Sequence, residues 1–130
     1  MDKKELIEKF KNRGINDEIL RAIEKVDRKN FVPEENLNEA YEDHPLHIGH
    51  GQTISQPYTV AFMLQQLELK KGDKVLEIGT GSGWNAALIS EIVGTEGKVY
   101  SLEVVEELAT QAREKLKDYK GASQNEHASY

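Results

Sequence analysis

Residues 74–84 combine side-chain types and a spacing that suit the binding of a nucleotide cofactor. A short apolar run, typical of a buried parallel strand, ends in glycines at alternate positions: Gly79, Gly81 and Gly83. Glycine has no Cβ, so the backbone here can adopt positive φ and approach a ligand closely. Helical apolar spacing follows from Trp84 to Val93, and the free N–H groups of that helix would face the same point. This order of strand, loop and helix predicts a cofactor site at the loop.

Two acidic residues accompany the glycines. Glu77 precedes the loop, and Glu103 ends a second predicted strand over Lys98–Leu102. That separation is roughly the one at which an acidic residue meets ribose hydroxyls in nucleotide-binding folds, where one carboxylate accepts two hydroxyl protons. The alternatives are that Glu103 is a solvated strand end and that Glu77 only complements the helix dipole.

The glycine spacing distinguishes between cofactors. A dinucleotide fingerprint would place its third glycine at position 84, which is Trp84, so a nicotinamide-dependent oxidoreductase is disfavoured. Alternate glycines after an acidic residue instead resemble the first motif of S-adenosylmethionine-dependent methyltransferases. A tight turn that binds no ligand remains the alternative for the loop alone.

A second informative segment, residues 47–58, contains the sequence Gln-Thr-Ile-Ser-Gln-Pro. Together with residues 28–33 and 40–43, it closely resembles the protein-L-isoaspartate O-methyltransferases, the repair enzymes for damaged aspartyl and asparaginyl sites. The resemblance runs from the N-terminal helices to about Tyr119. It implies methyl transfer from S-adenosyl-L-methionine to the free carboxylate of L-isoaspartyl residues in damaged proteins and peptides.

The resemblance also implies roles for individual residues. Ser55 corresponds to the family's active-site serine, and its neighbours Gln52, Thr53 and Ile54 would bind substrate. The cofactor would be bound by Glu77, Gly79, Thr80, Gly81, Gly83 and Glu103. No metal is implied.

Ser55 suits this chemistry on physical grounds. Methyl transfer from a sulfonium is an in-line displacement that depends on positioning, and a carboxylate acceptor is already ionised near neutral pH. Hydroxyl groups on Ser55 and Thr53 could orient that carboxylate, while Gly49 and Gly51 leave room for a peptide backbone. The alternative is that Ser55 is the N-cap of the next helix, with Pro57 in its first turn.

Histidine recurs at every third position, at His44, His47 and His50. A metal site is disfavoured because Pro45 and two glycines break any helix that would align the rings. The segment is predicted to be a loop near the active site, and the resemblance implies that His50 lies close to the cofactor.

Composition limits the function classes. The chain has 130 residues, a formal net charge of −6 and no cysteine. These values predict a cytoplasmic protein without disulfides and argue against nucleic acid as a partner. No apolar run approaches membrane-spanning length.

The predicted fold class is α/β, a Rossmann-like S-adenosylmethionine-dependent methyltransferase fold with an incomplete parallel sheet and an N-terminal helical cap. Residues 1–55 would carry two amphipathic helices and an irregular loop. The resemblance implies that this part covers substrate and cofactor. Residues 56–120 would form the first half of the Rossmann-like domain, and residues 121–130 a polar tail without regular structure.

Only two parallel strands are evident, so the sheet would have an exposed apolar edge beside Lys98–Leu102. We therefore expect marginal stability or self-association through that edge. Because the family's further motif for the adenine is absent, a non-catalytic cofactor-binding or interaction remnant of such an enzyme is the alternative function.

Overall fold

The computed structural model describes residues 1–119 and, as backbone, 124–127. The chain forms two compact units, Met1–Glu68 and Leu69–Tyr130. The division at Glu68 assigns the helix after Ser55 to the first unit, whereas the sequence analysis grouped it with the second. Within the described residues, no helix has the length and apolar character that a membrane span requires.

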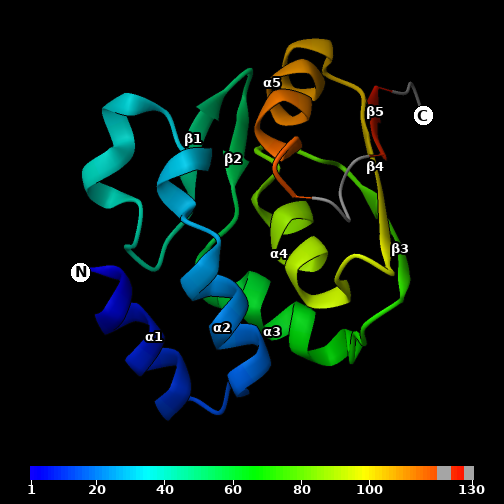
Figure 1. The fold of residues 1–130 in the computed structure, drawn as a ribbon. Helices are drawn as coiled ribbons and strands as arrows, with labels where there is room; N and C mark the ends of the chain where they lie inside the picture. Colours follow the sequence, from blue (N-terminus) through cyan, green and yellow to red (C-terminus); the bar gives the residue numbers. More distant parts are fainter. Residues whose placement is uncertain (120–123, 128–130) are drawn as a thin grey trace. The chain divides into compact units, whose positions relative to one another are not determined.

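The first unit contains three α-helices (Figure 1): α1 (Lys3–Asn12), α2 (Asp17–Lys25) and α3 (Pro57–Leu67). Asp2 and Glu5 form a capping box at the start of α1, and the Asn16 side chain accepts the Ile19 N–H at the start of α2. The apolar faces of α1 and α2 are buried, as their spacing predicted. The Tyr58 ring of α3 packs edge-on against Phe10 of α1, with centroids 5.5 Å apart.

The segment between α2 and α3 is more regular than the predicted loop. It contains two 3₁₀ helices, η1 (Arg28–Phe31) and η2 (Glu34–Glu39), and an antiparallel pair of strands, β1 (Leu46–Gly49) and β2 (Gln52–Ile54). His50 and Gly51 connect the two strands, and both have positive φ, 55° and 70°. Positive φ at both positions is typical of the two-residue turns that close hairpins. The sequence obscured this hairpin because its turn carries a histidine where asparagine or aspartate is usual.

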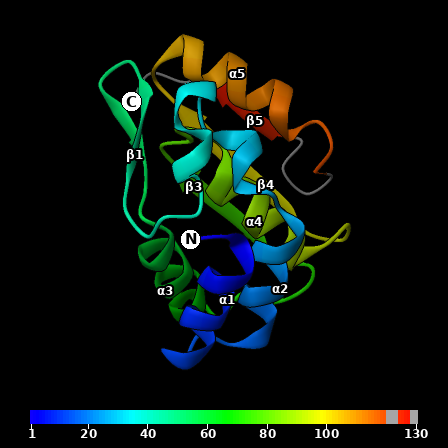
Figure 2. The same cartoon turned by 90° about the vertical axis from the view of Figure 1, so that its left-hand side faces the viewer.

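The second unit is a parallel sheet with helices on one face. Its elements are β3 (Lys74–Ile78), α4 (Trp84–Val93), β4 (Lys98–Glu103), α5 (Glu106–Leu116) and β5 (Gln124–His127). Figures 1 and 2 show α4 and α5 on the same side of the three strands. The predicted α/β class with a small parallel sheet is therefore confirmed.

The strand order β3-β4-β5 corrects two expectations. Residues 124–127 pair with β4 in parallel register instead of belonging to an unstructured tail. The strand Lys98–Glu103 is consequently internal to the sheet, so it does not provide the predicted free edge. Residues 120–123 and 128–130, also assigned to or next to that tail, lie outside the described residues.

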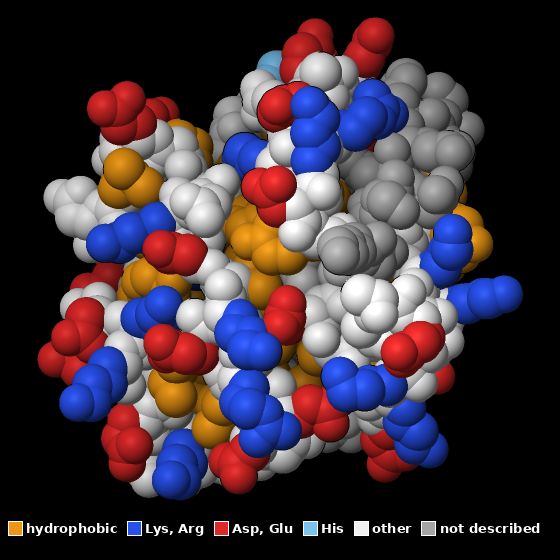
Figure 3. All heavy atoms as spheres, in the orientation of Figure 1, with side chains coloured by type: hydrophobic (Ala, Val, Ile, Leu, Met, Phe, Trp, Pro, Cys, Tyr) orange, Lys and Arg blue, Asp and Glu red, His pale blue; other side chains and the backbone are white. Residues whose placement is uncertain are grey.

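The two faces of this sheet differ in exposure. On β4, Val99, Ser101 and Glu103 are buried on the side of the helices. Alternate residues point to the opposite face, where Leu76 is 61%, Ile78 59% and Tyr100 41% exposed. The apolar surface that the unit leaves open is thus a sheet face. Elsewhere, Figure 3 shows Lys and Arg side chains interspersed with Asp and Glu side chains.

Candidate active site

The glycine loop lies between β3 and α4 and is joined to the end of β4. Gly79, Gly81 and Gly83 have φ of 93°, 55° and 94°, the conformations for which glycine is favoured. The N–H groups of Gly79 and Thr80 donate to the Leu102 carbonyl at 2.8 and 3.0 Å. The loop is therefore held at the carboxyl ends of both strands, where open α/β sheets bind their ligands.

Two of the glycines differ in their surroundings. A Cβ built on Gly83 would lie 3.4 Å from Ala112 Cβ of α5, which is an ordinary packing contact. A Cβ built on Gly81 would meet none of the described atoms within 4 Å. The backbone at Gly81 thus faces open space, as a loop that admits a ligand requires.

Glu103 is buried at the end of β4, with 6% of its surface exposed. Its Oε1 accepts the Gly81 N–H at 2.8 Å, and its Oε2 accepts the Val105 N–H at 3.0 Å. The alternative that Glu103 is a solvated strand end is therefore wrong. The carboxylate joins the glycine loop directly to the loop that follows β4.

Glu77 belongs to a chain of polar side chains beneath the loop. Its Oε2 accepts from Asn85 Nδ2 at 2.8 Å, and its Oε1 accepts from the Ser101 hydroxyl. The Ser101 and Thr80 hydroxyls lie 2.5 Å apart, which links the chain to the loop. Burial raises the pKa of Glu77, and the charge of Glu103 adds to this, while the hydrogen bonds from Ser101 and Asn85 oppose it.

Sequence reasoning missed Asn85 and Ser101. Strand alternation could have found Ser101, because it lies two residues before Glu103 and so shares its face of β4. No comparable signal marks Asn85, since its side chain meets Glu77 only once α4 has packed beside β3.

The predicted substrate-binding residues lie on the first unit. Gln52 and Thr53 are exposed on β2, whereas Ile54 is 2% exposed and pairs with Leu46 of β1. A contact between Ile54 and substrate would therefore fall to its backbone. Ser55 follows the strand directly and is exposed.

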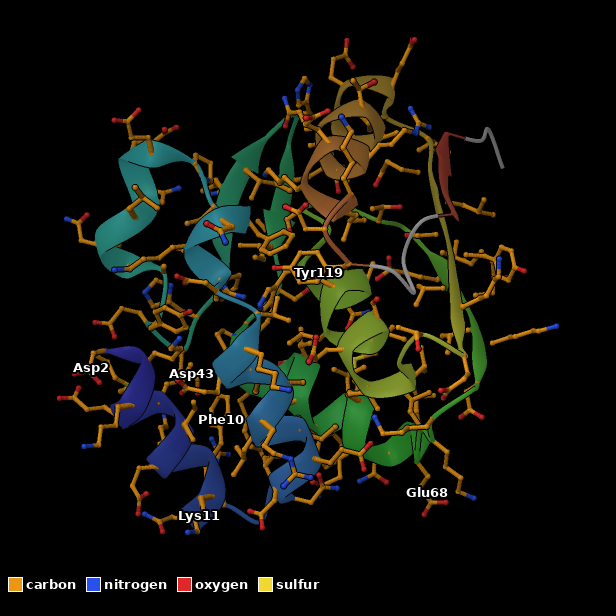
Figure 4. The ribbon with its side chains drawn as sticks, in the orientation of Figure 1. Asp2, Phe10, Lys11, Asp43, Glu68 and Tyr119 are labelled. Atoms are coloured by element: carbon orange, nitrogen blue, oxygen red, sulfur yellow. The ribbon has the colours of Figure 1, made fainter. Side chains whose placement is uncertain are left out.

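Ser55 does not cap α3, which corrects that alternative. Gln56 occupies the N-cap position, and the Tyr58 N–H in the first turn donates to Asp43 Oδ1 at 2.9 Å. Figure 4 shows Asp43 close to α1, where Lys9 Nζ lies 3.1 Å from its Oδ2. Among the described residues, none forms a hydrogen bond with the Ser55 hydroxyl. The serine is therefore available for a ligand.

The histidines occupy different structural positions. His47 lies on β1 and His50 in the hairpin turn, while the His44 ring lies 3.0 Å from the Pro45 carbonyl and 3.7 Å from Glu39. A search of the described residues finds no group of three His, Cys, Asp or Glu side chains placed to hold a metal ion. The role suggested for His50 stays a prediction.

Comparison with known proteins decides the family. The family model described as Protein-L-isoaspartate(D-aspartate) O-methyltransferase (PCMT) matches residues 1–127. The chain belongs to this family. A protein-L-isoaspartate O-methyltransferase of Ignicoccus hospitalis is 58% identical over 100 residues, which are 77% of this chain and 47% of that protein. The corresponding protein of Methanosarcina mazei is 51% identical over 116 residues, 89% of this chain and 48% of that protein.

Solved structures agree with this assignment. A structure of a protein-L-isoaspartate O-methyltransferase aligns with 98% of this chain and with 41% of that protein's chain, with 30% identity and a TM-score of 0.84. A structure of a putative enzyme of this type from Plasmodium falciparum, in complex with S-adenosyl-L-homocysteine, aligns with 92% of this chain and with 57% of that protein's chain, with 31% identity and a TM-score of 0.79. The Rossmann-like methyltransferase fold is therefore confirmed. The chain spans about half the length of the curated relatives it matches.

Proposed function

We propose that the chain transfers a methyl group from S-adenosyl-L-methionine to the free carboxylate of L-isoaspartyl residues in damaged proteins and peptides. The observation that carries this proposal is the glycine loop, which is bound to a buried Glu103 and has open space at Gly81. The membership of the chain in the isoaspartyl methyltransferase family supports S-adenosyl-L-methionine as the ligand of this loop and isoaspartyl residues as the substrate class.

The cofactor would be bound by the loop and its two acids: Glu77, Gly79, Thr80, Gly81, Gly83 and Glu103. The residues fit such a ligand, because the Gly81 backbone is unobstructed and each Glu103 oxygen, with one N–H already bound, keeps a further lone pair for a ribose hydroxyl. S-adenosyl-L-methionine supplies an electrophilic methyl group on a sulfonium. The hydrogen bonds of Glu77 with Asn85 and Ser101 would in addition hold the loop in shape.

The acceptor carboxylate would be oriented by Ser55, with Gln52, Thr53 and the Ile54 backbone binding the peptide beside it. The Ser55 hydroxyl is exposed and does not cap α3, so it is able to donate to a carboxylate oxygen. An ionised carboxylate needs no general base, and a hydroxyl donor orients it without neutralising it. The task of these residues is thus to place the acceptor and exclude water.

A second candidate is a cofactor-binding remnant without catalysis, and the observation in its favour is that the chain spans about half of its relatives. The partners would be isoaspartyl-containing proteins or a second copy of the chain. The location would be the cytoplasm, which suits a sequence without cysteine.

Two measurements separate the candidates. Both predict that S-adenosyl-L-homocysteine binds and that Glu103→Ala weakens its binding, which calorimetry measures directly. Only the enzyme predicts transfer of labelled methyl to an L-isoaspartyl peptide. Binding without transfer would favour the remnant, and absence of both would contradict the proposed cofactor site.

A further inference from the structure

Arg28 is fully buried in the first unit, with 0% of its surface exposed. Its Nε donates to the Ala40 carbonyl at 2.7 Å, and its Nη2 donates to the Ser55 carbonyl at 3.1 Å. Its own backbone N–H donates to the Tyr41 hydroxyl at 2.9 Å, and that hydroxyl donates to Asp27 Oδ1 at 2.6 Å. One side chain therefore connects η1, the segment after η2 and the residue that follows β2.

Burying a guanidinium in a protein core costs more free energy than burying an apolar side chain. Desolvation is costly for a charged group, and burial lowers the pKa of Arg28 to about 10, so the group still carries its charge at neutral pH. An apolar side chain of similar volume would often pack there at no loss of stability. The arginine differs from an apolar side chain in that its planar N–H donors fix two backbone carbonyls relative to each other.

Ser55 is the residue on which this fixation acts most directly. Its neighbour Ile54 is anchored by burial, and α3 is held by the hydrogen bond from the Tyr58 N–H to Asp43. The Arg28 contact is made to Ser55 itself, and the Ser55 side chain forms no hydrogen bond within the described structure. The direction of the Ser55 Cα–Cβ bond, from which the hydroxyl extends, is therefore set by the backbone that Arg28 holds.

We propose that Arg28 is a positioning residue that holds the backbone of Ser55 in the orientation in which its hydroxyl meets the acceptor carboxylate. This rests on the proposed function of Ser55, but the fixation itself does not. A purely structural arginine would affect the stability of the whole unit and leave Ser55 no more mobile than its neighbours.

The test uses the full chain with Arg28→Lys, which keeps the charge but cannot reach both carbonyls through one planar group. Arg28→Met is the second variant, and Val26→Ala is the control, because Val26 is also fully buried and no hydrogen bond links it to Ser55. The first readout is the ¹⁵N order parameter of the Ser55 amide. We expect about 0.85 in the parent and the control, and below about 0.6 in Arg28→Lys.

The second readout is the affinity for an L-isoaspartyl peptide in the presence of S-adenosyl-L-homocysteine. We expect Arg28→Lys to weaken peptide binding at least tenfold and to leave the affinity for S-adenosyl-L-homocysteine within twofold. An unchanged order parameter at Ser55 in Arg28→Lys, or an equal loss in Val26→Ala, would overturn the inference. A parent that shows the expected order at Ser55 but binds no peptide would contradict the proposed function and leave the fixation by Arg28 standing.

Tyr41→Phe serves if Arg28→Lys does not fold, because it removes the contact with the Arg28 N–H. We expect a smaller change of the same kind in the order parameter and in peptide affinity, and the absence of that change would overturn the inference.

Discussion

Two side chains near the start of α3, those of Asp43 and Ser55, differ in their hydrogen bonds. Asp43 accepts the Tyr58 N–H, whereas the Ser55 hydroxyl remains unengaged within the described residues. A serine that capped the helix would use its hydroxyl in a hydrogen bond that stabilises the fold. Here Asp43 makes the hydrogen bond to the first turn of α3, so the Ser55 hydroxyl remains available for a ligand.

The first prediction compares these two residues. Ser55→Ala should change the free energy of unfolding by less than about 0.5 kcal/mol, because it removes no hydrogen bond of the fold. Asp43→Ala should lose about 0.5–2 kcal/mol through the helix contact alone, in addition to the ion pair with Lys9, whereas Asp43→Asn should keep the helix contact and lose only the ion pair. Urea unfolding at a single pH measures all three variants. A cost near 1 kcal/mol for Ser55→Ala would show that the serine caps α3 after all.

Glu77 provides a prediction about pH. Its pKa in the folded protein is raised, so folding favours the protonated form. The contribution of Glu77 to stability is therefore present below its ordinary pKa of 4.5 and is lost as the pH rises through the folded value. Glu77→Gln should gain stability relative to the parent as the pH rises from 4.5 toward neutrality. Denaturant unfolding across that range checks this, with the exposed Glu96→Gln as control. Parallel curves for parent and Glu77→Gln would exclude the effect.

At the scale of elements, the strand, loop and helix of the proposed cofactor site were predictable because their signals are local. Glycine spacing and apolar periodicity place β3, α4 and β4 without knowledge of the fold. Gln124–His127 has no such pattern, and it becomes a strand because β4 offers an edge with which to pair. Arg28 and Asp43 escaped prediction for the same reason, since their partners lie 27 and 15 residues away.

The glycine loop yields a prediction with a matched control. Gly81→Ala places a methyl group in the open space of the loop and strains a positive φ of 55°. Gly94→Ala at the end of α4 strains a similar φ of 73° away from the loop. Each should lose about 1 kcal/mol or more of stability. Only Gly81→Ala should weaken S-adenosyl-L-homocysteine binding, at least tenfold by calorimetry. Equal affinities for the two variants would show that the loop does not contact the cofactor.

At the scale of the molecule, the second unit leaves apolar residues of one sheet face exposed, and β3 and β5 are its edge strands. Parallel sheets are normally covered on both faces, yet Leu76, Ile78 and Tyr100 are exposed on a unit whose relatives continue for about twice the length of this chain. The sequence anticipated an exposed apolar region but located it on β4. Because β5 pairs with β4, the exposed apolar side chains lie on a face of the sheet, and two of the three belong to β3.

We accordingly predict self-association through this face. Sedimentation velocity should show a mass that rises with concentration, and the thermal midpoint should rise with it. The double variant Leu76→Thr and Ile78→Thr should reduce association, since it removes two exposed apolar side chains and places β-branched residues, which suit a strand, at both positions. A strict monomer with a sharp, concentration-independent melt would contradict this.

The most direct test of the central claim is the rate of labelled methyl transfer from S-adenosyl-L-methionine to a peptide containing L-isoaspartate, with the matching L-aspartate peptide as control. We predict labelling of the isoaspartyl peptide alone, and its loss in Ser55→Ala, a variant that should remain folded. No labelling by a folded chain that binds S-adenosyl-L-homocysteine, or equal labelling of both peptides, would contradict the claim that this chain carries isoaspartyl methyl transfer.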